Sequence, residues 1–523
     1  MWPWVEITMK IINRLSHVSR VTLLLVAFFG LNSAVAFIRQ VMIARQFGLS
    51  ADLDAFNVAN NLPDMLFVLI SGGALSMAFI PVLAEQITKG GRQKAWDLFS
   101  KIANLAFIVT AVVAILVAIS AEALVGWELG IAPGFHTEQQ ELVADLMRLN
   151  LIATLIFSIS GLVMAGLQAN QHFLLPAMAP LLYNVGQIFG VVVLSPESGY
   201  QIGPITLPAF GLGVHGLVLG VITGALLHLG IQIPGLIKHQ FKWNAGFGLK
   251  TEPVRKVLRL MGPRLATMLF IQMMFIVRDN LASRLEEGAV TALTFGWMIF
   301  QVPQTLIGTT IGIALLPTLS EQNTREEWDA FQQSINRVVQ VLIAITLPVA
   351  VVLAFGLRPF LAMAFGFEQA GTDLLMLVTR AYMAGLLGQS LVEVSVRSFY
   401  ARQTPLIPLI AAGLAFLCYV LIGSQLFRLG GAPGISLTDS IVFTAQATLL
   451  LIFLNRRLIK SISIGGSLVR AFLATLTGGV VVWLGMTYLV GMNPLLQSGI
   501  SVAAGGLAAL PIILPELRLL LKL

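Results

Sequence analysis

The chain has 523 residues, of which 57% are hydrophobic and 11% charged, and its mean hydropathy is +0.87. Soluble globular proteins carry about 25% charged residues, so this composition excludes folding in water. The net charge of +7 comes from basic residues in short loops between apolar runs, which is typical of membrane topology signals and disfavours nucleic-acid binding. Cys418 is the single cysteine, which excludes a disulfide framework.

The chain opens with residues 1–20, which hold Trp2, Trp4 and three basic residues and no clear signal-peptide cleavage site. We expect this stretch to be a retained interfacial lead-in. Beyond it, runs long enough to cross about 30 Å of hydrocarbon recur and predict about fourteen transmembrane helices. They fall near residues 21–47, 55–84, 99–127, 142–168, 173–195, 209–235, 255–283, 289–318, 333–356, 374–400, 405–427, 434–454, 466–490 and 495–517.

Basic residues gather in alternate loops. The loops after the second, sixth and twelfth runs are rich in Lys and Arg, whereas residues 48–53 and 196–208, in loops of the other parity, include none. Loops rich in Lys and Arg stay in the cytoplasm, so this pattern predicts that both termini are cytoplasmic.

An internal repeat divides the chain. The segment from Ala78 to Gln86 recurs from Ala314 to Gln322, 236 residues later. Each copy holds six runs, an even number, so the two copies should share one orientation in the membrane. We therefore predict an all-α integral membrane fold with two parallel six-helix lobes and two C-terminal helices. The expected boundaries are 1–20 for the lead-in, 21–240 and 241–460 for the lobes, and 461–523 for the last two helices.

Polar residues inside the first two runs point to a site. An ionised residue at the centre of a membrane helix costs about 3 kcal/mol, so it should face a cavity, a partner or the interface. Asn32 and Arg39 are seven residues apart and share one helix face. One face of the second run holds Asp54, Asn57, Asn61 and Asp64. We interpret the two faces as the lining of a hydrated cavity in the first lobe; an Arg39–carboxylate pair that only joins two helices is the alternative.

The second lobe has weaker candidates. Glu393 and Arg397 lie four residues apart in the tenth run, where they could line the same cavity. Arg264 and Arg278 share a face of the seventh run, near its opposite ends. Snorkelling to the interface, or pairing of Arg278 with Asp279, explains these two arginines equally well without a function.

Other motifs are discounted. Gly211 to Gly216 match the dinucleotide-binding pattern but lie in an apolar run with no strand before them. Gly216, Gly220 and Gly224 continue at four-residue spacing, which predicts a close helix-packing face. The six histidines show no metal-ligand spacing. We expect neither a cofactor nor a metal.

Several segments carry a family resemblance. The run from Arg39 to Gly48, the pair Leu62-Pro63 and the segment from Ala78 to Glu85 closely resemble the MurJ/MviN family of lipid II flippases, and the likeness covers nearly the whole chain. It implies the fold of the MOP exporter superfamily, with a groove for the polyprenyl tail in the last two helices. It also implies a monomeric transporter, not an enzyme, that moves lipid II from the cytoplasmic to the periplasmic leaflet of the bacterial inner membrane, among membrane lipids, by alternating access.

The resemblance also bears on the binding residues. We expect substrate contacts from Arg39, Asp54, Asn57, Asn61, Asp64, Arg264, Arg278, Glu393 and Arg397. The family's cavity normally holds several arginines, but Ser33, Phe67 and Met298 stand at basic positions and Gly72 at an acidic one. A flippase of another polyprenyl-diphosphate saccharide, or another MOP exporter, is therefore the alternative. Asp52 and Asp54 resemble the acidic loop of membrane glycosyltransferases, but the two-lobe repeat disfavours such an enzyme.

Overall fold

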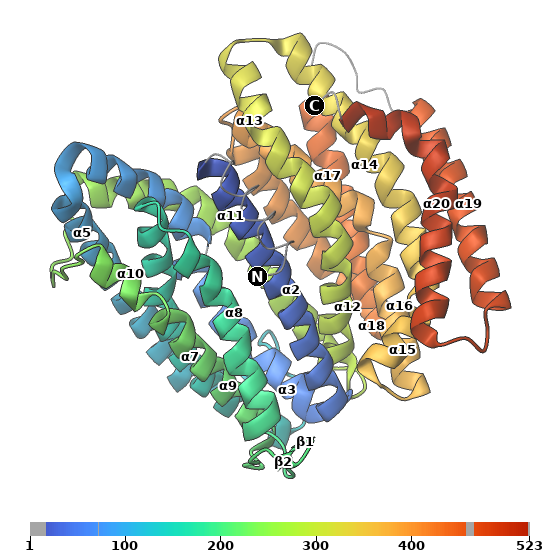
Figure 1. Cartoon of the computed structure of the whole chain (residues 1–523), viewed down its shortest axis with the longest axis horizontal. Coiled ribbons are helices and arrows are strands. Elements are labelled where there is room, and N and C mark those ends of the chain that lie inside the picture. Colours follow the sequence, from blue (N-terminus) through green and yellow to red (C-terminus); the bar gives the residue numbers. More distant parts are fainter. Residues whose placement is uncertain (1–16, 72, 457–464, 521–523) are drawn as a thin grey trace, which may run out of the picture. The chain divides into compact units, whose positions relative to one another are not determined.

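The computed structural model describes residues 17–71, 73–456 and 465–520, and these are helical almost throughout (Figure 1). The strands β1 (Gln201–Ile202) and β2 (Ile205–Thr206) pair antiparallel in a short hairpin. An α-helix satisfies its own backbone hydrogen bonds, which is why an apolar chain crosses a bilayer in this form.

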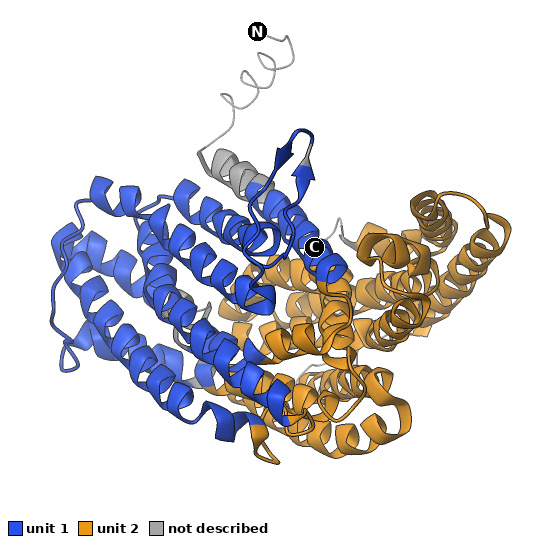
Figure 2. Cartoon of the chain, turned by 90° about the horizontal axis from the view of Figure 1, so that it is seen from below, with its two compact units in different colours: residues 1–46, 59–125, 137–265 blue, residues 47–58, 126–136, 266–523 orange. Residues whose placement is uncertain are grey.

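Two compact units divide the chain (Figure 2). The first unit comprises residues 1–46, 59–125 and 137–265, and the second comprises residues 47–58, 126–136 and 266–523. The helix α11 (Glu252–Ala282) passes from the first unit to the second after Leu265, and α2 (His17–Phe47) ends one residue inside the second unit.

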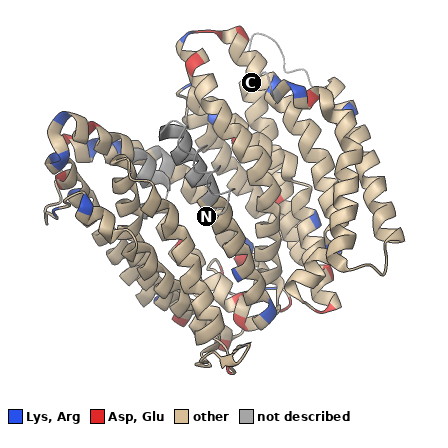
Figure 3. Ribbon diagram, viewed as in Figure 1, with Lys and Arg blue, Asp and Glu red and all other residues tan. Residues whose placement is uncertain are grey.

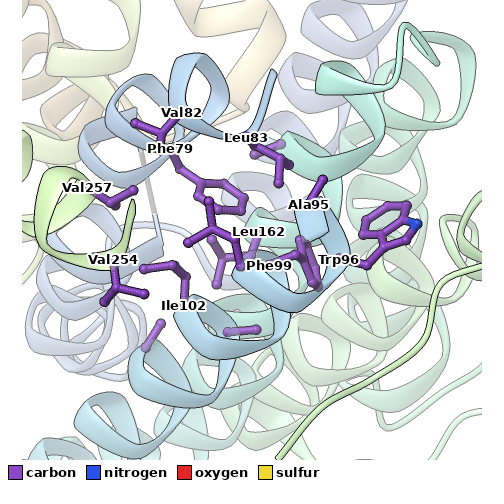
Figure 4. Packing of buried hydrophobic residues seen from close by; sticks show 14 of the residues in the cluster. Phe79, Val82, Leu83, Ala95, Trp96, Phe99, Ile102, Leu162, Val254 and Val257 are labelled. Carbon is purple, nitrogen blue, oxygen red and sulfur yellow. The ribbon is translucent and has the colours of Figure 1, made fainter. Parts of the chain in front are cut away.

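The first unit contains four further long helices and three short ones of six residues. They are α4 (Asn61–Leu66), α5 (Gly73–Ile119), α6 (Ala121–Gly126), α7 (Thr137–Ala169), α8 (Leu174–Phe189), α9 (Gly213–Gly230) and α10 (Ile233–Lys238). Figure 4 shows the core that α5 and α7 form with α11, where Phe79, Phe99 and Leu162 pack against Val254 and Val257.

Close backbone contact joins α8 and α9. A Cβ atom at Gly186 would collide with the backbone of Gly224, and one at Gly190 would lie 2.7 Å from the Cα of Gly220. Lipid tails are as apolar as leucine, so helices in a membrane associate by close packing, which small residues allow. The glycine spacing in α9 predicted this packing face.

The second unit begins with α3 (Ala51–Ala59) and continues from the last part of α11. Its other helices are α12 (Ala289–Gln304), α13 (Thr310–Thr324), α14 (Trp328–Gly356), α15 (Arg358–Phe365), α16 (Gln369–Met383), α17 (Leu386–Ala401), α18 (Leu406–Asn455), α19 (Gly465–Tyr488) and α20 (Pro494–Leu520). Its largest core packs α13, α14, α17 and α18 around Phe331 and Phe399. α19 and α20 pack on each other and on α14.

Among the described residues, ten helices are long and apolar enough to cross a membrane, and the pair α16 and α17, bent by 43°, raises this to eleven. Two of the ten are interrupted, α5 at Gly91 (φ 76°) and α18 at Gly431 (φ 57°). They have 47 and 50 residues, and at about 1.5 Å per residue each is more than twice as long as the hydrocarbon layer is thick. The total of about fourteen crossings stays a prediction.

Three π-helical turns interrupt the spans. They are η1 (Phe67–Ser71) before α5, η2 (Gly190–Leu194) after α8, and η3 (Thr305–Thr309) between α12 and α13. The single helix expected over residues 55–84 is therefore divided into α3, α4, η1 and the start of α5. π-turns widen the helix locally and often occur at functional sites.

Candidate functional site

Charged residues lie mostly near helix ends, and few lie within the helical spans (Figure 3). Arg39, on α2 in the first unit, is one of the few. Its Nη1 donates to Oδ1 of Asn184 at 2.7 Å, and its Nη2 lies 3.4 Å from Oε1 of Gln40. Its Nε is buried and has no hydrogen-bond partner among the residues that the structure describes. The guanidinium is thus held by neutral amides, and its Nε–H is not used by either of them.

Asn184, on α8, connects two residues of α2. Its Oδ1 accepts from Arg39, and its Nδ2 donates to Oδ1 of Asn32 at 2.8 Å and to the carbonyl oxygen of Pro180 at 3.1 Å. Only 4% of Asn184 is exposed. A buried amide with its oxygen and nitrogen both bonded has one preferred orientation, so Asn184 fixes the position of the Arg39 guanidinium.

Asp64, on α4 of the same unit, is exposed, whereas Arg39 is half-buried. Among the described residues, the Asp64 carboxylate makes no hydrogen bond or ion pair. Tyr183 lies close enough to both Asp64 and Arg39 to interact with them electrostatically, and its ring packs edge-on against Phe157 at 5.1 Å. The first unit therefore presents an arginine, a carboxylate and a phenol in one neighbourhood, which we call the Arg39 cluster: Asn32, Arg39, Asp64, Tyr183 and Asn184.

Asp54, on α3 in the second unit, has a different position from the one expected. Its carboxylate accepts from the backbone N–H of Gly288 and of Thr291, both at 2.7 Å, and from the Thr291 hydroxyl at 2.6 Å. Both oxygens cap the first turn of α12, and the residue is 1% exposed. Asn57 donates to the same threonine at 3.1 Å. Asp54 thus caps α12, and its predicted contact with the substrate stays a prediction.

Arg278, on α11 in the second unit, is also occupied. It is 7% exposed, its Nε donates to Oδ1 of Asp279 at 2.8 Å, and its guanidinium lies 5.0 Å from the Phe275 ring centre. The hydroxyl of Tyr419 contacts the neighbouring carboxylate of Asp439 at 3.4 Å. This geometry matches the pairing considered as the alternative for Arg278. The side chain of Arg264 lies outside the described residues.

Glu393 and Arg397, on α17, form an ion pair at 3.1 Å and are both half-buried. Nη1 of Arg397 also donates to the Thr309 carbonyl oxygen, at the end of η3, at 3.1 Å. Gly312 lies directly against this arginine, so a Cβ there would require the Arg397 guanidinium to move. Asn61, on α4, is half-buried.

Asn184 and Tyr183 are absent from the residues expected from sequence. The signal available was weak: Asn184 and Gln187 are amides within the otherwise apolar fifth run, and nothing local links them to Arg39, 145 residues away. Within residues 17–71, 73–456 and 465–520, no group of three or more His, Cys, Asp or Glu side chains could hold a metal ion.

The fold of the chain is similar to the solved structure of lipid II flippase MurJ in an inward closed conformation. The TM-score is 0.79 at 20% sequence identity, and the match covers 95% of this chain and 100% of that one. A MATE multidrug transporter of the MOP superfamily, in an inward-facing conformation, matches with a TM-score of 0.67 at 15% identity, over 82% of this chain and 94% of its own.

Sequence relatives extend this likeness. The chain is 29% identical over 487 residues to the lipid II flippase MurJ of Burkholderia cenocepacia, covering 90% of each chain. It is 25% identical over 478 residues to the probable lipid II flippase MurJ of Rhizobium tropici, covering 88% of this chain and 85% of the relative. Residues 43–511 match the family described as lipid II flippase MurJ. Because this match spans most of the chain, the chain belongs to the lipid II flippase MurJ family.

Proposed function

We propose that this protein translocates lipid II across the membrane, from the cytoplasmic to the periplasmic leaflet, by alternating access. Its relatives are named as lipid II flippases, and a flippase is a transporter and not an enzyme. The observation in this chain that carries the proposal is the Arg39 cluster, which holds a guanidinium inside a membrane-embedded unit without a carboxylate bonded to it.

The chemistry of the substrate fits this cluster. A diphosphate offers several anionic oxygens, and a guanidinium binds two of them at once through its planar fork. Among the described residues, Nε of Arg39 is buried without a partner and Nη2 has only a 3.4 Å contact, so these two groups on one edge of the fork keep hydrogen-bonding capacity for a phosphate that reaches them. Asn184 holds the opposite edge through Nη1. Asp64 is exposed and forms no ion pair within the described part of the chain; it would face an uncharged or cationic part of the headgroup, because it would repel phosphate.

The finer organisation is part of the proposal. The internal repeat supports two lobes, over residues 21–240 and 241–460, and a C-terminal helix pair over residues 461–523. The loop charges support about fourteen crossings with both termini in the cytoplasm. α19 exposes large apolar side chains, Phe472 at 62% and Trp483 at 59%, which support contact with a polyprenyl tail. Localisation in the bacterial inner membrane and a monomeric state complete the proposal.

A second candidate is a flippase for a different polyprenyl-diphosphate saccharide. It is favoured by the residues at family positions that are usually charged: Ser33, Phe67, Gly72 and Met298. Phe67 packs its ring 5.1 Å from that of Phe157, so an apolar contact has replaced a basic one there. Fewer arginines leave less charge for the diphosphate and more room for a headgroup of another shape.

Native mass spectrometry of the purified protein separates the two candidates. We expect a co-purified polyprenyl diphosphate carrying the lipid II headgroup, and its amount should fall strongly in Arg39→Ala. The matched control is Arg325→Gln, which removes an arginine from an exposed ion pair with Glu321. A bound lipid of another headgroup mass would support the second candidate, and no polyprenyl diphosphate in any preparation would contradict both.

A further inference from the structure

The segment 239–251, between α10 and α11, is held along one face of α5; we call it the strap. Nε1 of Trp96 donates to the carbonyl oxygen of His239 at 3.0 Å. Two turns further along α5, Nδ2 of Asn104 donates to the carbonyl oxygens of Asn244 at 2.7 Å and Gly246 at 3.0 Å. Trp96 and Asn104 lie eight residues apart and so share a helix face. The strap has no regular secondary structure, yet its backbone is fixed at both ends of this face.

Aromatic packing fixes the strap further. The ring of Phe241 lies 5.3 Å from those of Trp96 and Phe99, edge to face with both. Nε1 of Trp243 donates to Oδ1 of Asn104 at 2.8 Å. The indole N–H is thus bound to the protein, while 65% of Trp243 is exposed. The strap is therefore ordered, and its exposed surface has a defined composition.

That surface combines apolar and basic side chains. Trp243 is joined by Phe247 at 40% and Leu249 at 53% exposure. Lys242 and Lys250 are exposed, and neither forms an ion pair among the described residues. Residues 239–251 contain no Asp or Glu. Exposed large apolar groups on an ordered loop mark a contact surface, and two uncompensated lysines beside them favour an anionic partner.

The position of the strap identifies the partner. The helical stretch that can span the membrane ends at Lys238, directly before the strap. Trp side chains concentrate at membrane–water interfaces, and Lys and Arg next to a span attract anionic lipids. We propose that the strap is a docking surface for anionic lipid headgroups, in which Trp243, Phe247 and Leu249 enter the interface and Lys242 and Lys250 bind lipid phosphates. The inference does not depend on lipid II as the substrate.

Spin labelling of the full-length protein tests this surface. Cys418→Ser removes the single cysteine, and Ala245→Cys places a label at an exposed position inside the strap. The protein is placed in nanodiscs of phosphatidylcholine with rising fractions of phosphatidylglycerol. We expect the label to become less mobile and less accessible to a water-soluble relaxation agent as the phosphatidylglycerol fraction rises, and high salt should reverse the change.

Matched variants test whether Lys242 and Lys250 cause the change in label mobility. Each lysine near an anionic surface is worth about a fivefold change in lipid association, so Lys242→Gln with Lys250→Gln should weaken the response about 25-fold. Lys89→Gln with Lys94→Gln removes the same charge from α5 outside the strap and should leave the response unchanged. An equal response in phosphatidylcholine alone, an equal loss in the control, or ordering of the label only when another protein is added would each overturn the proposal.

Discussion

Two arginines within the membrane-embedded helices, Arg39 in the first unit and Arg278 in the second, show opposite ways of placing a charge away from water. Arg278 is 7% exposed, bonded to the Asp279 carboxylate and close to the Phe275 ring. Arg39 is half-buried and bonded to the neutral amide of Asn184, and its Nε has no partner among the described residues.

The different partners of the two arginines predict different roles, a structural one for Arg278 and a ligand-binding one for Arg39. A buried arginine that is neutralised by a carboxylate has little left for a ligand, because an anion would have to displace the carboxylate first. An arginine held by amides keeps its positive charge and can gain from a phosphate. In the sequence both residues look alike, as charged residues in apolar runs, and only their hydrogen-bond partners in the structure differ. The following variants test whether their roles differ as well.

Arg39→Ala should have the largest effect. Loss of a charge-assisted contact to phosphate in a site shielded from water costs about 4 kcal/mol, roughly a thousandfold in transport. Flipping of fluorescent lipid II in proteoliposomes is the measurement. Arg39→Lys should recover only part of the lost transport, because an ammonium lacks the planar fork of a guanidinium. Thermal unfolding should change little in both variants, and normal flipping by a well-folded Arg39→Ala protein would reduce this residue to a structural role.

Arg278→Met should instead lower stability, by about 3 kcal/mol, because Asp279 is left buried without its guanidinium. The midpoint of thermal unfolding in detergent measures this effect. Arg278→Met with Asp279→Asn should be more stable than the single variant, since the buried carboxylate that lost its guanidinium is gone. Flipping per folded molecule should persist. A stable Arg278→Met protein that no longer transports would instead make Arg278 a substrate ligand.

Asn184→Ala should reduce transport about tenfold, roughly 1.4 kcal/mol, because Arg39 loses the bond that orients it. Asn184→Asp is the sharper variant. Its carboxylate would pair with Arg39, so the protein should stay folded while lipid binding falls further than in Asn184→Ala. Gln187→Ala, at a buried amide of the same helix, is the control. If Asn184→Asp bound lipid as well as the original protein, the positioning role would be wrong.

Asp54→Asn should have the smallest effect, about 1 kcal/mol of stability, because an amide keeps one acceptor for the first turn of α12 but loses the charge and the second acceptor. The midpoint of thermal unfolding measures this loss of stability. Asp52→Asn, at an exposed neighbouring position, is the control. Lipid binding by the folded protein should be unchanged. Loss of binding at full stability would return Asp54 to the substrate site.

The sequence predicted what depends on local periodicity. The shared face of Asn32 and Arg39 follows from their spacing on one helix, and the spacing of Glu393 and Arg397 matches the ion pair they form. The capping of α12 by Asp54 could not be foreseen, because its partners lie 234 and 237 residues away and a carboxylate in an apolar run has the same pattern whether it binds a ligand or caps a helix. Asn184 was missed for the same reason: only tertiary packing brings it to Arg39.

The π-turns η1 and η3 bear on the history of the chain. η1 precedes the segment that contains Pro81, and η3 precedes its repeat around Pro317, so each copy carries one at nearly the same place. π-helical turns are rare and occur mostly as single turns inside α-helices. Because they are rare, their recurrence at nearly corresponding places of the repeat is explained most simply if the irregular turn was already part of the repeated unit.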